Sequence, residues 1–124
     1  MIGIDLVKVD RIQKLIEKYQ DHFLNKIFSP IEIKYAESAS DTLRYERYAA
    51  RFAAKEAIVK ALGTGFRKIT WKDIEIIKDS LDAPKVKLSK RAQNFCAQKQ
   101  IQDIALSISH THDYAVASAL IIKN

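Results

Sequence analysis

The stretch RFAAKEAIVKALGTG, residues 51–65, indicates a long helix that ends in a glycine turn. Ala, Leu, Lys and Glu favour the helix, no Pro interrupts it, and Gly63 and Gly65 are suited to end it. At about 100° per residue, the large apolar side chains form one arc, and alanines fill most of the remaining surface. The sequence therefore predicts a buried central helix from about Thr42 to Leu62.

Four charged residues on this helix conflict with its burial. Arg51 and Lys55 fall within the apolar arc, whereas Glu56 and Lys60 share a line on roughly the opposite side. The pair Glu56 and Lys60 has the spacing of a solvated salt bridge, which is worth about 0.3–0.5 kcal/mol. Alternatively, an ionic partner compensates the buried charges, and a metal–diphosphate group would meet all four of them. The spacing alone leaves both interpretations open.

The composition indicates one globular domain covering residues 1–124. Hydrophobic residues make up 48% and charged residues 29%, with only 3 Gly and 2 Pro. A chain of this length buries about two thirds of the surface that its unfolded form exposes. A single cysteine excludes an internal disulfide framework, and the apolar start is too short for a signal peptide or a membrane span. We therefore expect a cytoplasmic protein.

The charge balance predicts an anionic partner. Lys and Arg number 21 against 15 for Asp and Glu, which gives a net charge of +6. Charge alone does not distinguish among nucleic acid, an acidic protein, a phosphorylated small molecule and a membrane surface.

The pattern along the chain predicts an α+β fold, with helices early and strands late. Residues 2–9 alternate as a strand, with Gly3, Asp5 and Val7 on one face. A helix is predicted at residues 11–19, with Asp10 as its cap, followed by two short helices within residues 21–38. The second of these begins with Ser29 as cap, Pro30 at the first helical position and Glu32 three residues after the cap. The remaining predicted elements are strands at residues 71–78 and 85–89, a helix capped by Ser89, and an antiparallel hairpin whose strands meet around residues 110–113.

Asp5 lies in the middle of an apolar strand, where an uncompensated carboxylate is costly. A Lys or Arg partner, or exposure at the strand end, would remove that cost. A hard cation is the third explanation, because Mg²⁺ takes one or two protein carboxylates and completes its shell with water and phosphate oxygens. Asp5 and Glu56 would form such a pair.

The two histidines in SISHTHD, His110 and His112, stand two residues apart, which places them on one face of a strand. This spacing is compatible with a zinc site, with exposed residues of a turn, or with a polar rim that binds phosphate. Cys96 lies on the apolar line of its helix and is expected to be a core thiol.

Two further groups have alternative interpretations. Gly63, Thr64 and Gly65 would allow close backbone approach to a ligand, but they serve equally well as a helix stop. Arg11, Lys14 and Lys18 form a basic ridge on one helix face, which is either solvated or a docking surface for an acidic helix.

Taken together, these residues resemble the holo-acyl-carrier-protein synthase family, the small bacterial 4′-phosphopantetheinyl transferases. The resemblance covers nearly the whole chain and rests on five blocks in the order and spacing of that family, with Ala83 where the family usually has Gly. The blocks are GIDLVKVDRI (3–12), FSPIEIKYAES (28–38), RFAAKEAIVKALGTG (51–65), WKDIEI (71–76) and LSISHTHDYAVASAL (106–120).

The resemblance implies an α+β fold that assembles as a homotrimer, with active sites between neighbouring subunits. It implies transfer of phosphopantetheine from coenzyme A to a serine of apo acyl carrier protein, in fatty acid biosynthesis, with release of adenosine 3′,5′-bisphosphate. Asp5 and Glu56 match the family's Mg²⁺ ligands, and the serine's general base is left open. Catalytic residues would be Asp5, Glu56 and Lys60; coenzyme A would contact Arg51, Lys60, Gly63, Thr64, Gly65, Ser109, His110 and Thr111; the carrier protein would dock on Arg11, Lys14 and Lys18.

Two other functions compete with this one. A nucleic-acid-binding domain would use RYERYAAR, residues 44–51, to stack tyrosines on bases among arginines, but it leaves Asp5 without a role. A catalytically silent protein that binds acidic partners would also explain the net charge.

Overall fold

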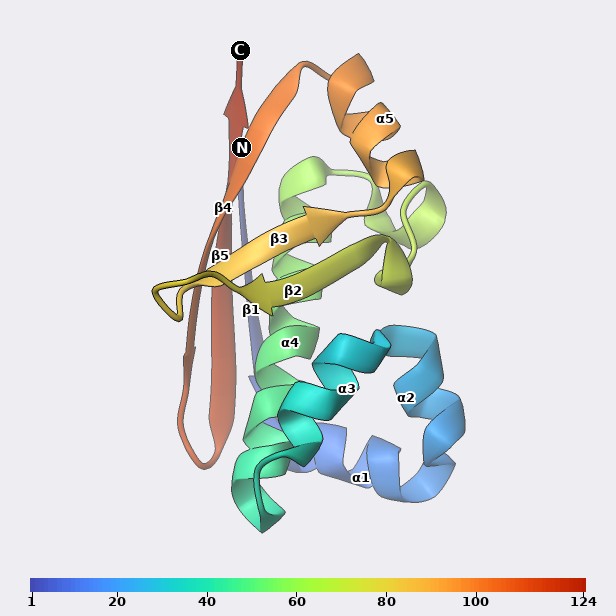
Figure 1. Ribbon diagram of the computed structural model, residues 1–124, viewed down its shortest axis with the longest axis vertical. Coiled ribbons are helices and arrows are strands. Elements are labelled where there is room, and N and C mark those ends of the chain that lie inside the picture. The colour runs from blue at the N-terminus through green and yellow to red at the C-terminus, as the bar shows by residue number, and fades with distance from the viewer.

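The long helix α4 (Asp41–Leu62) lies against one face of a three-stranded antiparallel sheet in the computed structural model, which describes residues 1–124 (Figure 1). The strand order is β1–β5–β4, so that the last strand, β5 (Tyr114–Lys123), is central between β1 (Ile2–Lys8) and β4 (Ile101–His110). The predicted central helix and the terminal antiparallel hairpin are both confirmed.

Two groups of smaller elements complete the α+β fold. Figure 1 shows α1 (Val9–Tyr19), α2 (Asp21–Ile27) and α3 (Pro30–Glu37) gathered around one end of α4. The second group comprises two short 3-10 turns at Gly65–Arg67 and Trp71–Asp73, the two-stranded sheet of β2 (Ile74–Lys78) and β3 (Pro84–Leu88), and α5 (Lys90–Gln98). None of the helices combines the length and the apolar character that crossing a membrane requires.

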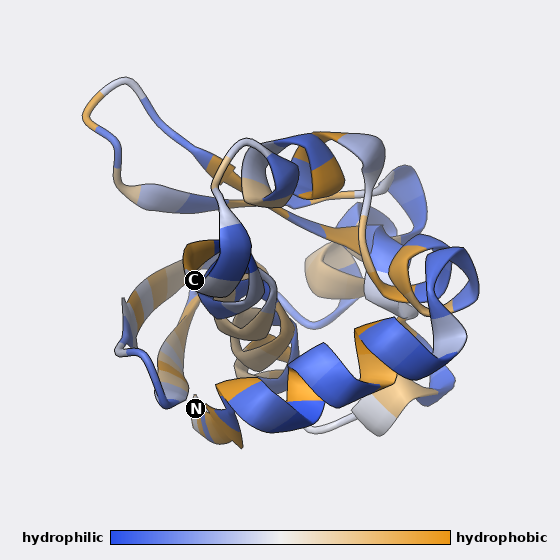
Figure 2. Ribbon diagram, turned by 90° about the horizontal axis from the view of Figure 1, so that it is seen from below, coloured by the Kyte–Doolittle hydropathy of each residue, from blue (hydrophilic) through white to orange (hydrophobic).

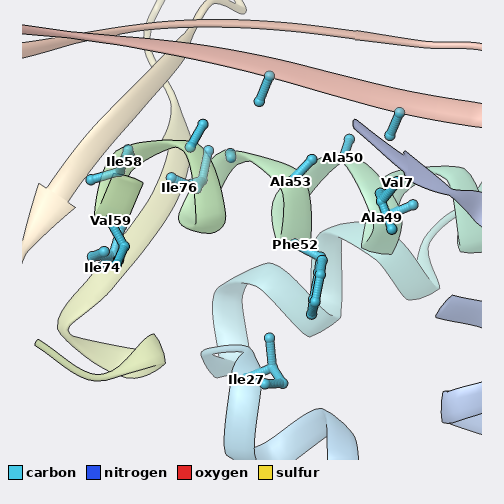
Figure 3. Packing of buried hydrophobic residues seen from close by; sticks show 14 of the residues in the cluster. Val7, Ile27, Ala49, Ala50, Phe52, Ala53, Ile58, Val59, Ile74 and Ile76 are labelled. Carbon is cyan, nitrogen blue, oxygen red and sulfur yellow. The ribbon is translucent and has the colours of Figure 1, made fainter. Parts of the chain in front are cut away.

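Helix α4 is enclosed on most sides, as the view in Figure 2 shows. Its alanines face the sheet, and Ala50 and Ala53 point towards β4 and β5 in Figure 3, whereas Phe52 points away towards Ile27 of α2. Cys96 is buried in the same core, as expected for a core thiol.

Glycine and alanine bring β1 directly onto α4. A Cβ atom added to Gly3 would lie 2.1 Å from the carbonyl oxygen of Ala57 and 2.7 Å from the amide nitrogen of Ala61. Only a residue without a side chain fits there. Asp5 lies two residues further along the same face of β1, where its carboxylate reaches Lys60 of the helix.

Most predicted helix ends are confirmed. Gly63 ends α4 in the left-handed conformation with φ 76°, and the Ser29 hydroxyl and the Glu32 carboxylate form the predicted capping box of α3 around Pro30. The Ser89 hydroxyl accepts a hydrogen bond from the amide of Ala92 at the start of α5. These ends are set by short-range hydrogen bonds, which is why the sequence predicts them.

Two predicted boundaries are wrong. Asp10 is not the cap of α1, because the chain enters the helix directly from β1 and the amide of Val9 donates to the carbonyl of Asp113 across the sheet. The strand predicted from Trp71 begins at Ile74 instead, because Thr70 and Asp73 form a capping box around a 3-10 turn.

Neighbouring residues accommodate Ala83, which stands where the family resembled by the sequence usually has Gly. Asp82, not Ala83, takes the left-handed conformation in this turn, with φ 64°. The Asp79 carboxylate accepts hydrogen bonds from the amides of Leu81 and Ala83, at 2.8 and 3.0 Å, and closes the β2–β3 turn.

Candidate active site

Asp5 and Lys60 meet where β1 crosses α4. The Lys60 ammonium donates to Asp5 Oδ1 at 2.9 Å and to the carbonyl oxygen of Ile4 at 3.1 Å, although the chain separates Asp5 and Lys60 by 55 residues. The Asp5 side chain is 14% exposed and the Lys60 side chain 52% exposed. One edge of this cluster is therefore open to solvent.

Glu56 lies one helical turn before Lys60, on the same side of α4. Burial raises the pKa of Glu56 above its ordinary value, and the nearby charge of Asp5 raises it further, while Lys60 and Arg11 act in the opposite direction. The structure thus brings Asp5, Glu56 and Lys60 together, as the sequence predicts. We call these three residues the acidic cluster.

The acidic cluster fits a hard divalent cation. Two carboxylates that raise each other's energy gain most from a positive ion between them, and Mg²⁺ needs only one or two carboxylates from the protein. Nowhere in the chain do three His, Cys, Asp or Glu side chains group in a way that would hold a metal ion. Asp5 and Glu56 remain the predicted ligands.

Lys55 does not belong to this cluster. Its fully buried ammonium donates to Glu32 Oε1 and the carbonyl oxygen of Ile27, both at 2.7 Å, and to the carbonyl of Trp71 at 3.1 Å. Glu32 in turn accepts from the amides of Ser29 and Ile76. The hypothesis that one metal–diphosphate group meets all four charges of α4 is therefore wrong for Lys55, whose partners come from distant segments.

A second cluster of cations lies on another side of α4, beside a cavity of about 200 Å³. We call it the cationic pocket; its lining is Tyr35, Arg47, Ala50, Arg51, Lys78, Asp82, Pro84, Ile108 and His110. The sequence indicated only Arg51 and His110 for a common site. Tyr35 and Lys78 belong to elements far apart in the sequence, and no local pattern marked them.

Three cations surround one aromatic ring in the cationic pocket. The guanidinium carbons of Arg47 and Arg51 lie 4.3 and 4.4 Å from the Tyr35 ring centroid, and the Lys78 ammonium lies 4.7 Å away. The face of an aromatic ring attracts cations, so Tyr35 offsets part of their mutual repulsion. An anion in the pocket would offset the rest.

Arg51 is a buried guanidinium with no carboxylate partner in the chain. Its residue is only 6% exposed, and its Nε has no hydrogen-bond partner. Burial lowers the pKa of the Arg51 guanidinium. Buried polar groups are nearly always hydrogen-bonded, and Arg51 Nε and Arg44 Nε are the two buried side-chain atoms without a partner; of these two residues, only Arg44 pairs with a carboxylate, that of Glu37.

The two C-terminal histidines have different surroundings. His110 Nδ1 lies 2.9 Å from Glu46 Oε1 and the ring lines the cationic pocket. His112 pairs with Asp113 at 3.2 Å in the turn beyond β4, beside a separate cavity of about 480 Å³. Because β4 ends at His110, the alternating geometry of a strand does not extend to His112, and the zinc interpretation loses its basis.

The other residues predicted to contact coenzyme A are dispersed. Gly63 and Thr64 line a cavity of about 270 Å³ at the end of α4, about 18 Å along the helix from Arg51. Ser109 is exposed on β4, and the Thr111 hydroxyl accepts from the amide of Tyr114 within the hairpin turn. Gly65 follows in the same turn as Thr64, whose hydroxyl donates to its carbonyl.

The predicted basic ridge borders the acidic cluster. A groove of about 430 Å³ follows α1 and is lined by Lys8, Asp10, Arg11, Lys14, Leu15 and Lys18. The Arg11 guanidinium lies 5.8 Å from the centre of the Phe52 ring, one turn before Glu56 on α4. Arg11 is therefore the residue of the ridge whose charge reaches Glu56 of the acidic cluster.

The tyrosines of residues 44–51 are not available for base stacking. Tyr48 is fully buried and its hydroxyl donates to Glu37 at 2.6 Å, and Tyr45 is 8% exposed. The nucleic-acid interpretation therefore loses the aromatic surface on which it depended.

Known proteins share the whole of this fold. Residues 1–119 match the model of the 4′-phosphopantetheinyl transferase superfamily. The chain is 45% identical to the holo-[acyl-carrier-protein] synthase of Halothermothrix orenii, over 94% of this chain and 91% of the relative. It is 46% identical to the holo-[acyl-carrier-protein] synthase of Ruminiclostridium cellulolyticum, over 98% of this chain and 90% of the relative.

A solved structure agrees with these relatives. The crystal structure of Helicobacter pylori holo-[acyl-carrier-protein] synthase in complex with coenzyme A superposes with a TM-score of 0.86 at 34% identity, covering 98% of this chain and 100% of that one. The chain belongs to the 4′-phosphopantetheinyl transferase superfamily.

Proposed function

We propose that this protein is a holo-[acyl-carrier-protein] synthase, which transfers 4′-phosphopantetheine from coenzyme A to a serine of apo acyl carrier protein and releases adenosine 3′,5′-bisphosphate. The observation that carries the proposal is the acidic cluster, in which Asp5 and Glu56 raise each other's energy beside Lys60. Relatives with the same name match along nearly the whole chain.

Asp5 and Glu56 are the residues that would hold Mg²⁺. When bound, the ion stabilises negative charge on the oxygens of a diphosphate. Lys60 is close enough to share its ammonium between Asp5 and a phosphate oxygen, because half of its side chain is exposed. With an ion held by the two carboxylates, Lys60 would add a further positive charge where the displacement of the bisphosphate develops negative charge.

The cationic pocket supplies a second anion site for coenzyme A. Arg51 and His110 there are the residues predicted to meet its phosphates, including the 3′-phosphate. Arg51 has an unpartnered buried nitrogen, and two more cations stand on the same Tyr35 ring. A phosphate of two negative charges matches this concentration of positive charge.

Assembly as a homotrimer would explain why the acidic cluster and the cationic pocket lie on different sides of α4 within one chain. Arg51 and Glu56 are five residues apart on α4, which is about 140° around the helix, so a ligand reaching both would need another surface. The outer face of the sheet is apolar, with Ile2 70%, Ile4 63% and Leu6 63% exposed on β1. We propose that neighbouring subunits cover this face and complete each active site.

The basic ridge is the proposed docking surface for the acidic carrier protein. The groove along α1 is lined by Arg11, Lys14 and Lys18. The charge of Arg11 also reaches Glu56, where it opposes part of the rise in the pKa of that carboxyl. A carrier bound on this ridge would present its serine near the acidic cluster. The proposed setting is fatty acid biosynthesis in the cytoplasm.

The test is to mix the protein with coenzyme A, Mg²⁺ and apo acyl carrier protein and to weigh the carrier by mass spectrometry. The expected result is a carrier heavier by one phosphopantetheine arm. Glu56→Gln and Asp5→Asn are each expected to reduce the rate at least about a hundredfold. Asp103→Asn, an exposed carboxylate on β4, is the matched control and should leave the rate unchanged.

A carrier of unchanged mass with the wild-type protein would refute the proposed function. Normal turnover of Glu56→Gln or Asp5→Asn would remove that residue from the metal site. For the ridge, Arg11→Glu should raise the KM for the carrier and leave the KM for coenzyme A unchanged. Equal losses for both substrates would contradict the docking role.

A further inference from the structure

We propose that Glu46 is a positioning residue that holds His110 as a hydrogen-bond donor to the 3′-phosphate of coenzyme A. The inference rests on the proposed function and deepens it, because it assigns a role to a residue that neither the acidic cluster nor the cationic pocket includes. Glu46 and His110 are 64 residues apart and meet across the interface of α4 and β4.

The geometry isolates this pair. Glu46 Oε1 lies 2.9 Å from His110 Nδ1, and the Glu46 side chain makes no other hydrogen bond. Its side chain is 15% exposed, against 33% for His110. Burying a carboxylate costs free energy unless a hydrogen-bond partner compensates it, and His110 is the one partner that Glu46 has within the chain. Glu46 therefore serves the ring of His110.

The chemistry of the pair fixes the proton on the ring. An ionised carboxylate has only acceptors, so His110 Nδ1 must carry the hydrogen of this bond. The other ring nitrogen, Nε2, is then left for a different partner, and His110 lines the cationic pocket. As the imidazolium, His110 would donate from Nε2 to an anion there.

Charge in the pocket explains why the histidine needs a carboxylate. Arg47, Arg51 and Lys78 share the lining with His110 and oppose a fourth positive charge. Asp82 is the only acidic residue of the lining. Glu46 is not part of the pocket lining and engages only Nδ1, so the Nε2 of His110 remains available to a ligand. A carboxylate behind a histidine orients and charges the ring in the same way in many sites.

The test compares two donors that differ in one group, coenzyme A and 3′-dephospho-coenzyme A, in the carrier-modification assay. The wild-type protein should favour coenzyme A through a lower KM. Glu46→Gln keeps an acceptor for Nδ1 but removes the charge, and Glu46→Ala removes both. We expect the KM for coenzyme A to rise about tenfold in Glu46→Gln and more in Glu46→Ala, with kcat little changed.

The two donors separate positioning from general damage. Neither Glu46 variant should change the KM for 3′-dephospho-coenzyme A, because that substrate lacks the phosphate that His110 would meet. His110→Ala should show the same selective loss, and adding Glu46→Ala to it should cause no further loss. The matched control is Asp113→Asn, which alters the exposed pair of His112 and Asp113 beside another cavity.

Each outcome decides one question. If the wild-type protein modifies no carrier, the proposed function fails. If it does but Glu46→Ala leaves the KM for coenzyme A unchanged, or raises the KM of both donors equally, the role of Glu46 is refuted while the proposed function stands. A wild-type protein that uses both donors equally well would also refute the role of Glu46, since the pocket would then not recognise the 3′-phosphate.

Discussion

Arg51 and Lys55 are buried cations one turn apart on the same helix, yet their surroundings are opposite. Lys55 is fully buried and all three of its hydrogen-bond donors have an acceptor within the chain. Arg51 is nearly as buried, but its Nε has no partner and no carboxylate pairs with its guanidinium. The difference separates a charge whose partners all lie within the chain from a charge that we propose binds a phosphate of coenzyme A.

The comparison teaches that burial alone does not identify a functional charge. Lys55 and Glu32 are the most deeply buried charges of the chain, and they form a closed network that leaves nothing for a substrate. The groups assigned to function are those whose partners are too few, as at Arg51, or repel one another, as at Asp5 and Glu56. Arg44 also has an unpartnered Nε, but its guanidinium pairs with Glu37, so the absence of a carboxylate partner is what distinguishes Arg51.

The largest expected effect is on the closed network. Lys55→Met leaves the Glu32 carboxylate buried without its counter-ion, and removing one partner of a buried pair costs about 3–5 kcal/mol. The free energy of unfolding in urea, followed by fluorescence of Trp71, the single tryptophan, measures it. Lys60→Met, at the half-exposed cation, is the control and should lose less than about 1 kcal/mol. Equal losses in both variants would contradict the comparison.

A smaller loss of stability is expected where β1 touches α4. Gly3→Ala places a methyl group against the backbone of Ala57 and should cost about 1–3 kcal/mol. Because the strand must move away from the helix, Asp5 moves with it, and the rate of carrier modification should fall as well. Unfolding in urea and the mass assay measure the two effects. Full activity in a destabilised protein would show that the acidic cluster tolerates this displacement.

Arg51 is expected to behave in the opposite way from Lys55. Arg51→Met removes a buried nitrogen that has no partner and gives up its contact with Tyr35, so the free energy of unfolding should stay within about 1 kcal/mol of the wild-type value. The KM for coenzyme A should nevertheless rise about tenfold or more. A loss of stability as large as that of Lys55→Met would show that Arg51 is structural.

The smallest expected effect is a shift in titration. Burial and Asp5 raise the pKa of Glu56, so ionisation of this carboxyl is opposed in the folded protein, and its contribution to stability falls as pH rises through that pKa. Asp5→Asn removes the repulsion and should lower the pKa of Glu56. Adding Mg²⁺ to the wild-type protein should lower it too. NMR titration of the Glu56 carboxyl carbon measures both shifts, and no change in either case would show that Asp5, Glu56 and the ion do not interact.

Features that depend on neighbouring residues were predictable from the sequence. The capping box of Ser29 and Glu32, the glycine end of α4 and the alternation of the last two strands all follow from short-range patterns. The charges of α4 marked it as the helix that carries function. Asp5 was recognisable because a carboxylate in an apolar strand requires an explanation.

Features that depend on distant residues were not predictable in this way. Glu32 was recognised as part of a cap, but its second role depends on Lys55, Ile27 and Trp71 converging on one point. The cationic pocket likewise needs residues of α3, α4, β2, β3 and β4 to meet around one cavity. Glu46 had no local signal, because its partner lies 64 residues away.

The register of the main sheet also has a consequence for how the protein is made. Asp5 of the first strand is held opposite Ala117 of the last strand, so β1 finds its partner only after nearly all of the chain has left the ribosome. Contacts of such long sequence separation form slowly. Until β5 is available, Ile2, Ile4 and Leu6 have no strand partner, and a chain that ended before β5 would leave Asp5 without the strand that holds it in place.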